Sequence, residues 1–183
     1  MGSRKGTGEG RWRRVAPENR PAAELPDLDV PAMLRRLVAA GVDFVVIGGI
    51  AVLLQGYPRF TRDLDIAFAS DRANLKALGG VLVELEAKLR DVEPDLPFVP
   101  DERTLQGIEL LTLQTSSGLL DVQRRTPGVS SYESLRRRAD RVDIDGFSVL
   151  VASPDDLIAM KRAAGRPVDQ IDIAALEAIK RLR

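Results

Sequence analysis

Residues 43–68 read DFVVIGGIAVLLQGYPRFTRDLDIAF, and this stretch decides the fold. Its uninterrupted apolar run at 44–47 predicts a central strand. The pair Gly48-Gly49 follows and turns the chain into a short helix at about 50–55. A second strand, predicted from about residue 62 to 69, completes a strand–helix–strand arrangement.

The second strand carries two acids, Asp63 and Asp65, two positions apart. Side chains at positions i and i+2 of a strand point to the same face. Both carboxylates are therefore predicted to project together, while Leu64, Ile66 and Phe68 point the other way. Because neighbouring like charges destabilise each other unless a positive charge compensates them, this face is predicted to meet a cation and the opposite face to meet the core.

The rest of the chain alternates between predicted helices and strands. Apolar residues at helical spacing, bounded by capping residues and by glycine or proline, set the helix limits. Alternating apolar residues around turn residues indicate strands. The predicted helices cover about residues 29–41, 71–90, 130–139, 153–164 and 168 to the end, and the predicted strands cover 108–115, 119–123 and a pair within 141–152. Residues 91–103, which contain three prolines, are predicted to form a loop.

A third acid, Asp121, lies on the second strand of the hairpin predicted at 108–123. Leu120 and Val122 alternate with it, so Asp121 is predicted to face away from the apolar side of the strand. Asp121 is thus a candidate partner for the acid pair on the earlier strand.

The composition limits the kinds of catalytic and metal site that are possible, because the 183 residues include no Cys and no His. Disulfides, thiolate metal sites, imidazole zinc sites and a Ser-His-Asp triad are excluded. Three carboxylates suit a hard cation such as Mg²⁺, which usually takes one or two carboxylates together with substrate phosphates. Gly48-Gly49 lies between a strand and a helix, where backbone N–H groups can hold phosphate. The predicted reaction is nucleotidyl transfer: a hydroxyl attacks the α-phosphate of an NTP, and pyrophosphate leaves.

Two segments resemble a known superfamily. The pattern GGxA…RxTxDxD, formed by residues 48–51 and 59–65 and followed by the later strand acid Asp121, resembles the DNA-polymerase-beta-like nucleotidyltransferases. In detail it is similar to their AbiEii-type toxin branch and their aminoglycoside or lincosamide nucleotidyltransferase branch. Residues 161–172 are also similar to a KxxAxRxxDxxD-like segment of AbiEii-type proteins. The resemblance covers about residues 29–180.

The resemblance implies an α+β fold, in which a mixed β-sheet has helices packed on one face and the chain has a helical C-terminus. It also implies that Asp63 and Asp65 bind Mg²⁺ and that Asp121 completes the metal site or activates the attacking hydroxyl. Lys161 would contact the triphosphate, and Asp169 would orient it or a neighbouring base. Arg59 and Thr61 either contact phosphate or form part of a plain loop.

The acceptor stays open between a tRNA end and a small hydroxylated molecule such as an antibiotic. The resemblance further implies the toxin of a toxin–antitoxin pair, with an antitoxin protein as partner. Two alternatives remain: a non-catalytic binding module with the same fold, and a nucleic-acid-binding domain that uses the basic segment Arg11-Trp12-Arg13-Arg14. The expected organisation is a disordered or loosely docked basic tail at 1–27 and one nucleotidyltransferase-like domain at 28–183. No apolar run is long enough for a membrane span, so a cytoplasmic protein without membrane partners is expected.

Overall fold

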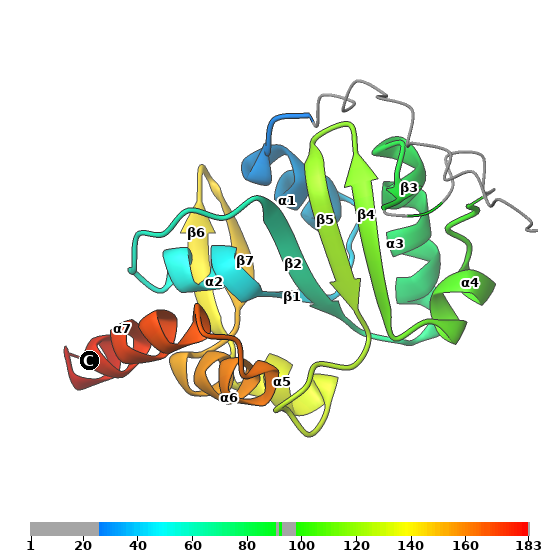
Figure 1. Ribbon diagram of the computed structural model, residues 1–183. Helices are drawn as coiled ribbons and strands as arrows, with labels where there is room; N and C mark the ends of the chain where they lie inside the picture. The colour runs from blue at the N-terminus through cyan, green and yellow to red at the C-terminus, as the bar shows by residue number, and fades with distance from the viewer. Residues whose placement is uncertain (1–25, 91, 93–97, 183) are drawn as a thin grey trace, which may run out of the picture.

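The computed structural model describes residues 26–90, 92 and 98–182 (Figure 1). The expected tail at 1–27 therefore lies, apart from its last two residues, outside the described residues. The described helices are α1 (Val30–Ala39), α2 (Gly48–Leu54), α3 (Arg72–Glu84), α4 (Glu102–Gly107), α5 (Tyr132–Arg138), α6 (Pro154–Ala164) and α7 (Asp169–Leu182). The described strands are β1 (Phe44–Ile47), β2 (Asp63–Phe68), β3 (Lys88–Leu89), β4 (Leu110–Thr115), β5 (Gly118–Gln123), β6 (Asp140–Ile144) and β7 (Phe147–Val151).

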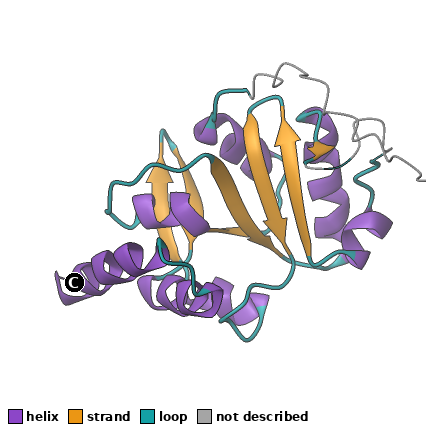
Figure 2. Ribbon diagram, in the orientation of Figure 1, coloured by secondary structure: helices purple, strands orange, loops and turns teal. Residues whose placement is uncertain are grey.

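The described strands form one mixed sheet in the order β3-β4-β5-β2-β1-β7-β6. The β2–β5 and β1–β7 pairs are parallel, whereas the other neighbouring pairs are antiparallel. Figure 2 shows this sheet bordered by helices, including the C-terminal pair α6 and α7. The predicted α+β class, mixed sheet and helical C-terminus are confirmed.

The two faces of the sheet differ around β2. Figure 1 shows α1 and α3 behind strands β2, β5 and β4, where they cover one face. Leu64 and Ile66 point to this side and are fully buried in the main apolar core, together with Met33 of α1 and Leu78 of α3. On the other side, α2 packs against β1 and β2 and touches α6. The centre of the sheet is therefore covered on both sides near β1, which explains why β1 is apolar at every position.

The predicted capping residues begin their helices. Asp29 accepts a hydrogen bond from the Ala32 N–H at 2.9 Å, and Asp71 accepts one from the Asn74 N–H at 3.0 Å. Ser153 accepts one from Asp156 at the start of α6, with proline at the first helical position. These caps satisfy donors that a helix start leaves unpaired.

The helix predicted over 71–90 is wrong at its C-terminal end. α3 ends at Glu84, and Glu86 adopts a left-handed backbone conformation with φ of 52°. This residue reverses the chain, so that Lys88 and Leu89 form a short edge strand beside β4. Leu89 has a helical spacing from Leu82 and Leu85, but it lies in strand β3.

The loop predicted over 91–103 is also corrected. α4 begins at Glu102 after Asp101, which caps it by accepting a hydrogen bond from the Thr104 N–H at 2.8 Å. The strand predicted from 108 begins at Leu110, because α4 extends to Gly107. None of the helices in the described ranges is long and apolar enough to cross a membrane.

Candidate active site

The strand register brings the three predicted acids to one face of the sheet. In the parallel β2–β5 pair, Asp65 lies directly beside Asp121, and Asp63 lies two residues earlier on the same face of β2. Antiparallel pairing places Ile47 on the other side of Asp65, at the end of β1. The acids thus lie where β1 passes into α2.

Gly48 and Gly49 allow close contact between the backbone and this acidic face. Gly48 adopts a left-handed conformation with φ of +65°, and a Cβ atom built on it would overlap the carboxylate of Asp65. A Cβ atom on Gly49 would lie 2.6 Å from the Thr61 hydroxyl oxygen. Both positions therefore require glycine for steric reasons, and Gly48 requires it for its backbone conformation as well.

Asp65 is the most strongly perturbed acid of the site. Burial, and then repulsion by Asp63 and Asp121, raise its pKa to about 7. Arg166 and a hydrogen bond from the Gly49 backbone N–H act in the opposite direction and do not offset these effects. A cation bound among these carboxylates would lower the pKa again, because it favours the ionised form.

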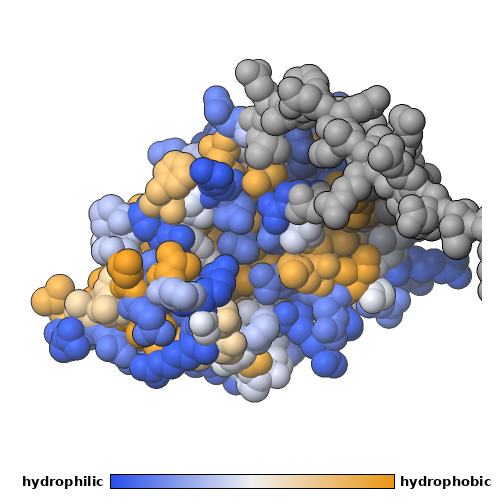
Figure 3. Space-filling view, in the orientation of Figure 1, coloured by the Kyte–Doolittle hydropathy of each residue, from blue (hydrophilic) through white to orange (hydrophobic). Residues whose placement is uncertain are grey.

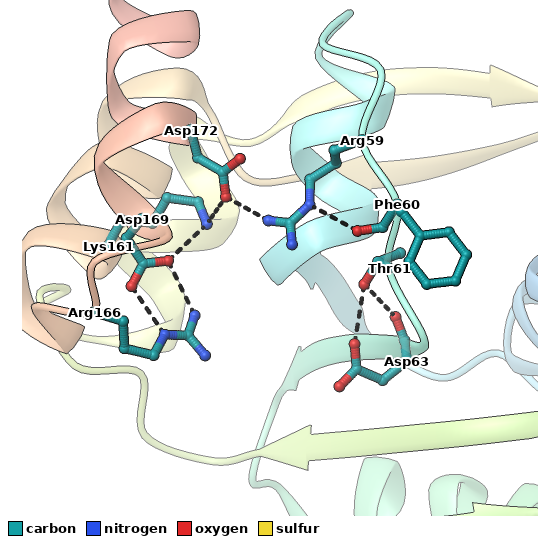
Figure 4. Close-up of polar contacts among 8 residues, drawn as sticks. All are labelled: Arg59, Phe60, Thr61, Asp63, Lys161, Arg166, Asp169 and Asp172. Atoms are coloured by element: carbon teal, nitrogen blue, oxygen red, sulfur yellow. Dashed lines mark hydrogen bonds and ion pairs between the residues drawn. The ribbon is translucent and has the colours of Figure 1, made fainter.

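Asp63 is oriented by its neighbour Thr61. The Thr61 hydroxyl donates a hydrogen bond to Asp63 Oδ1 at 3.0 Å (Figure 4). This contact fixes one carboxylate oxygen and leaves the other for a ligand. Thr61 was predicted to contact phosphate or to be a plain loop residue. In the structure it contacts an acid of the site.

A cleft of about 530 Å³ lies over the acids. It is lined from the β1–β2 side by Ile47, Gly48, Gly49, Arg59, Thr61, Asp63 and Asp65, from the β4–β5 side by Glu109, Leu110, Asp121, Gln123, Arg125, Thr126 and Pro127, and from the α6 side by Leu157, Met160, Lys161, Ala164 and Arg166. Figure 3 shows hydrophobic residues gathered over β4 and β5, with hydrophilic residues around them. The cleft has the size of a small-ligand site.

A second polar cluster joins the cleft to the C-terminal helices (Figure 4). Lys161 donates hydrogen bonds to Asp169 at 3.2 Å and to Asp172, and Arg59 donates to the same Asp172. Arg166 completes the cluster through two bonds to Asp169, at 2.9 and 3.1 Å. These five residues, Arg59, Lys161, Arg166, Asp169 and Asp172, are called the basic cluster below.

The acids of the basic cluster hold its cations in place. Lys161, Asp169 and Asp172 are at most 5% exposed. Burial opposes ionisation of Asp169, but the hydrogen bonds from Arg166 and Lys161 outweigh it and hold its pKa below the usual range. The structure therefore places Lys161, Asp169 and Arg59 together, with Lys161 and Arg59 bound to acids at the wall of the cleft.

Two residues of the site, Arg166 and Arg90, were not predicted from the sequence, and Asp172 was considered only together with Asp169 as an acid on the same helix face. Arg166 lines the cleft, has a side chain that is 66% exposed, and is attracted by both Asp65 and Asp63. Asp172 links α7 to α6 and to the loop before β2. Arg90 forms an ion pair with Asp121 at 3.3 Å. Arg166 and Asp172 lie inside the KxxAxRxxDxxD-like segment, which was their sequence signal, whereas Arg90 had none.

The acids fit a metal ion that takes some of its ligands from the protein and the others from a substrate. In the part of the chain that the structure describes, no group of three acidic side chains is arranged to hold a metal ion alone. Mg²⁺ does not need such a group, since it commonly takes one or two carboxylates and completes its shell with phosphate oxygens and water. Asp63 and Asp65, side by side and crowded by like charge, fit that requirement.

Comparisons with known proteins agree with this geometry. The family model described as "Nucleotidyltransferase of unknown function (DUF6036)" matches residues 28–183. No curated protein matches the chain by sequence. The solved lincosamide antibiotic adenylyltransferase LnuA, bound to lincomycin, has a TM-score of 0.57 and 16% identity over 84% of this chain and 99% of LnuA. The antibiotic-resistance factor ANT(2'')-Ia has a TM-score of 0.51 and 16% identity over 81% of this chain and 80% of its own. At such low identity, these two similarities show a shared fold.

Proposed function

The chain belongs to the DUF6036 family of nucleotidyltransferases, and we propose that it catalyses the Mg²⁺-dependent transfer of a nucleoside monophosphate from an NTP to a hydroxyl group. The observation that carries the proposal is the register of β2 and β5, which sets Asp65 beside Asp121 next to Gly48. A slip of one residue in this pairing would turn Asp121 to the opposite face of the sheet, away from Asp63 and Asp65.

Asp63 and Asp65 would hold the metal ion, and Asp121 would complete that site or accept the proton of the acceptor. Bound Mg²⁺ supplies neutralisation of the phosphate charges. The raised pKa of Asp65 supports this assignment, because burial and then the negative charges of Asp63 and Asp121 raise it, and a bound cation would offset these effects.

The reaction is a displacement at the α-phosphorus. The hydroxyl oxygen of the acceptor forms a bond to that phosphorus while the bond to the oxygen between the α- and β-phosphorus atoms breaks. Pyrophosphate leaves with the bonding electron pair, and the hydroxyl proton passes to a carboxylate, for which Asp121 is the candidate. Positioning and charge stabilisation carry most of the catalysis in transfers of this kind.

Arg166 is the candidate contact for the NTP phosphates. Its guanidinium lies in the cleft and is aimed by the paired bonds to Asp169. Lys161, expected to contact the triphosphate directly, is bound by Asp169 and Asp172 and would act as a positioning residue. Gly48 and Gly49 would let the phosphates approach the backbone.

Calorimetry with each NTP, in the presence and absence of Mg²⁺, tests the proposal. Wild-type protein should bind at least one NTP only with Mg²⁺, and Asp63→Asn/Asp65→Asn should abolish that binding while keeping its melting transition. Absence of Mg²⁺-dependent binding in the wild type would refute the proposal. Binding without transfer to any acceptor would favour the non-catalytic module.

ATP is the first donor to test, since the two structural relatives include an adenylyltransferase and an enzyme solved with adenylyl-tobramycin. Incubation with α-labelled NTPs and either total RNA or an antibiotic panel separates the two acceptor classes. Labelled tRNA would support the toxin-like reading of the C-terminal segment, and an antitoxin partner would then be sought by co-purification. A labelled antibiotic would support the alternative of a small-molecule enzyme.

A further inference from the structure

A second cavity adjoins the catalytic cleft. It has a volume of about 690 Å³ and shares four lining residues with the cleft: Glu109, Arg125, Thr126 and Pro127. Its other walls come from the end of β2, the connection after β5 and the first turn of α5. The two spaces therefore adjoin along these four residues, and the acids line the first of them.

The position of this cavity relates it to the acceptor side of the reaction. β5 carries Asp121 and ends at Gln123, and Arg124 follows directly. Three residues of extended chain span about 10 Å, which sets the backbone of Arg124 about that far from the backbone of Asp121. Gly48 and Arg166, the candidate donor contacts, line the cleft over the acids and not this cavity.

Two glutamates and two arginines line the cavity, and three of the four have a partner. Arg125 and Glu109 form an exposed ion pair at 3.6 Å. Glu133 lies at the start of α5, where hydrogen bonds from its own backbone N–H and from Ser131 lower its pKa. Arg124 differs, because its Nε atom is buried and makes no hydrogen bond within the described ranges.

A buried guanidinium nitrogen without a partner is unfavourable, since folding removes its bonds to water and returns none. Arginine is also the side chain that best matches the oxygens of a phosphate with paired hydrogen bonds. Ser70, Thr126 and Ser130 line the same cavity and can add hydroxyl donors. Arg124 and these hydroxyl groups can thus bind an anionic ligand with several oxygen acceptors.

We propose that this cavity holds the acceptor substrate, and that the acceptor carries a phosphate group which Arg124 binds. The inference rests on the proposed nucleotidyl transfer and adds the chemical class of its second substrate. The end of an RNA chain and a phosphorylated small molecule share this chemistry, with a phosphate close to a free hydroxyl. A polycationic acceptor without phosphate would leave Arg124 without an anionic partner.

The test measures acceptor binding apart from turnover. Full-length wild-type protein, Arg124→Gln and Arg137→Gln are titrated, with Mg²⁺ and without NTP, against a fluorescent oligoribonucleotide with a free 3′-hydroxyl and against a nucleoside 5′-monophosphate. Arg137 is the matched control, since it is an exposed arginine of α5 outside the cavity lining. Arg124→Gln should weaken binding of at least one probe tenfold or more, and Arg137→Gln should stay within threefold of the wild type.

NTP binding, measured on the same three proteins, separates this inference from the proposed function. Unchanged Mg²⁺-dependent NTP binding in Arg124→Gln shows that the donor site and the fold are intact. If Arg124→Gln does not fold, Arg124→Lys keeps the charge, loses the paired hydrogen bonds and should still weaken binding. If only the oligoribonucleotide binds, the acceptor that carries the phosphate is an RNA. If both probes bind, phosphorylated small molecules are also possible acceptors.

Three results would overturn the inference while NTP binding persists. One is that neither probe binds the wild-type protein. Another is that Arg124→Gln binds as tightly as the wild type. The third is that α-labelled NTP labels only acceptors without phosphate.

Discussion

At the scale of single residues, Gly48 shows how little space the site leaves for an added side chain. Its backbone has φ of +65°, and any side chain there meets the carboxylate of Asp65. Gly41 has nearly the same conformation, with φ of +69°, but among the described residues no atom beyond its chain neighbours lies within 4 Å of the position a Cβ would take. The two glycines therefore separate the cost of backbone strain from the cost of crowding the site.

We predict that Gly41→Ala lowers the free energy of unfolding by about 1 kcal/mol and leaves NTP binding unchanged. Gly48→Ala should lower it by about 3 kcal/mol, because crowding adds to strain, and should weaken NTP binding more than tenfold by displacing Asp65. Denaturant unfolding and calorimetry measure both effects. Equal NTP affinity in the two variants would contradict the role of Gly48.

Asp65 should make the stability of the metal-free protein depend on pH. Its pKa is about 7 in the folded chain and about 3.9 in an unfolded one. The folded state therefore binds this proton more tightly, and its stability is lost as the pH rises from about 4 through 7.

We predict that Asp65→Asn raises the free energy of unfolding of the metal-free protein at pH 8 by about 2 kcal/mol, with the partial exposure of the side chain taken into account. At pH 5 the gain should shrink to less than half, since Asp65 is then mostly protonated in the folded chain. Denaturant titrations in a chelating buffer at the two pH values measure the difference. A gain that is the same at both values would show that repulsion at Asp65 is not its cause.

At the scale of elements, the basic cluster fixes α7 to the wall of the cleft. Asp172 is 3% exposed and binds both Lys161 of α6 and Arg59 of the loop before β2. Glu177, one and a half turns later on the same helix, pairs with Arg162 on the surface. The two acids differ in burial and in the number of elements that they connect.

We predict that Asp172→Asn lowers the free energy of unfolding by about 3 kcal/mol, because it leaves buried cations without their counter-charge. Glu177→Gln should cost at most about 0.5 kcal/mol, as exposed ion pairs do. NTP binding should weaken in Asp172→Asn, since Arg59 and Lys161 lose their position, and should not change in Glu177→Gln. Similar unfolding curves for both variants would contradict a structural role for the cluster.

The sequence predicted elements where local chemistry determines them. Residues 43–68 contain an apolar strand, a glycine turn and an alternating acidic strand, and the structure repeats that order. The placement of Asp121 also followed from alternation with Leu120 and Val122. Local patterns did not show that α3 would stop at Glu84, because Leu82, Leu85 and Leu89 suit a helix as well as a turn and an edge strand.

The partners of the site residues could not be predicted, since they come from distant parts of the chain. Arg90 reaches Asp121 only because β3 pairs with β4 and β4 with β5. Arg59 meets Asp172 across 113 residues of sequence. Such contacts depend on strand order, which one sequence does not specify. Lys161 and Asp169 were predicted as site residues, but their mutual ion pair was not.

At the scale of the whole molecule, every residue proposed for donor and acceptor binding lies between Gly48 and Asp172. We therefore predict that a chain starting at residue 26 binds NTP within about twofold of the full-length affinity, as measured by calorimetry. Its RNA affinity should fall if Arg11-Trp12-Arg13-Arg14 contacts RNA, while the difference between wild type and Arg124→Gln should persist. Loss of NTP binding on this truncation would show that the first 25 residues contribute to the donor site.

The parallel pairing of Val46 with Val151 determines when the enzyme can form during synthesis. β1 is complete early, but its second neighbour β7 follows about 100 residues later. At roughly 5–20 residues per second, the ribosome needs on the order of 5–20 s to supply it. Asp172, which anchors α7, is made later still. A nascent chain therefore carries Asp63 and Asp65 without a closed cleft, and the proposed site can form only after Asp172 has been made.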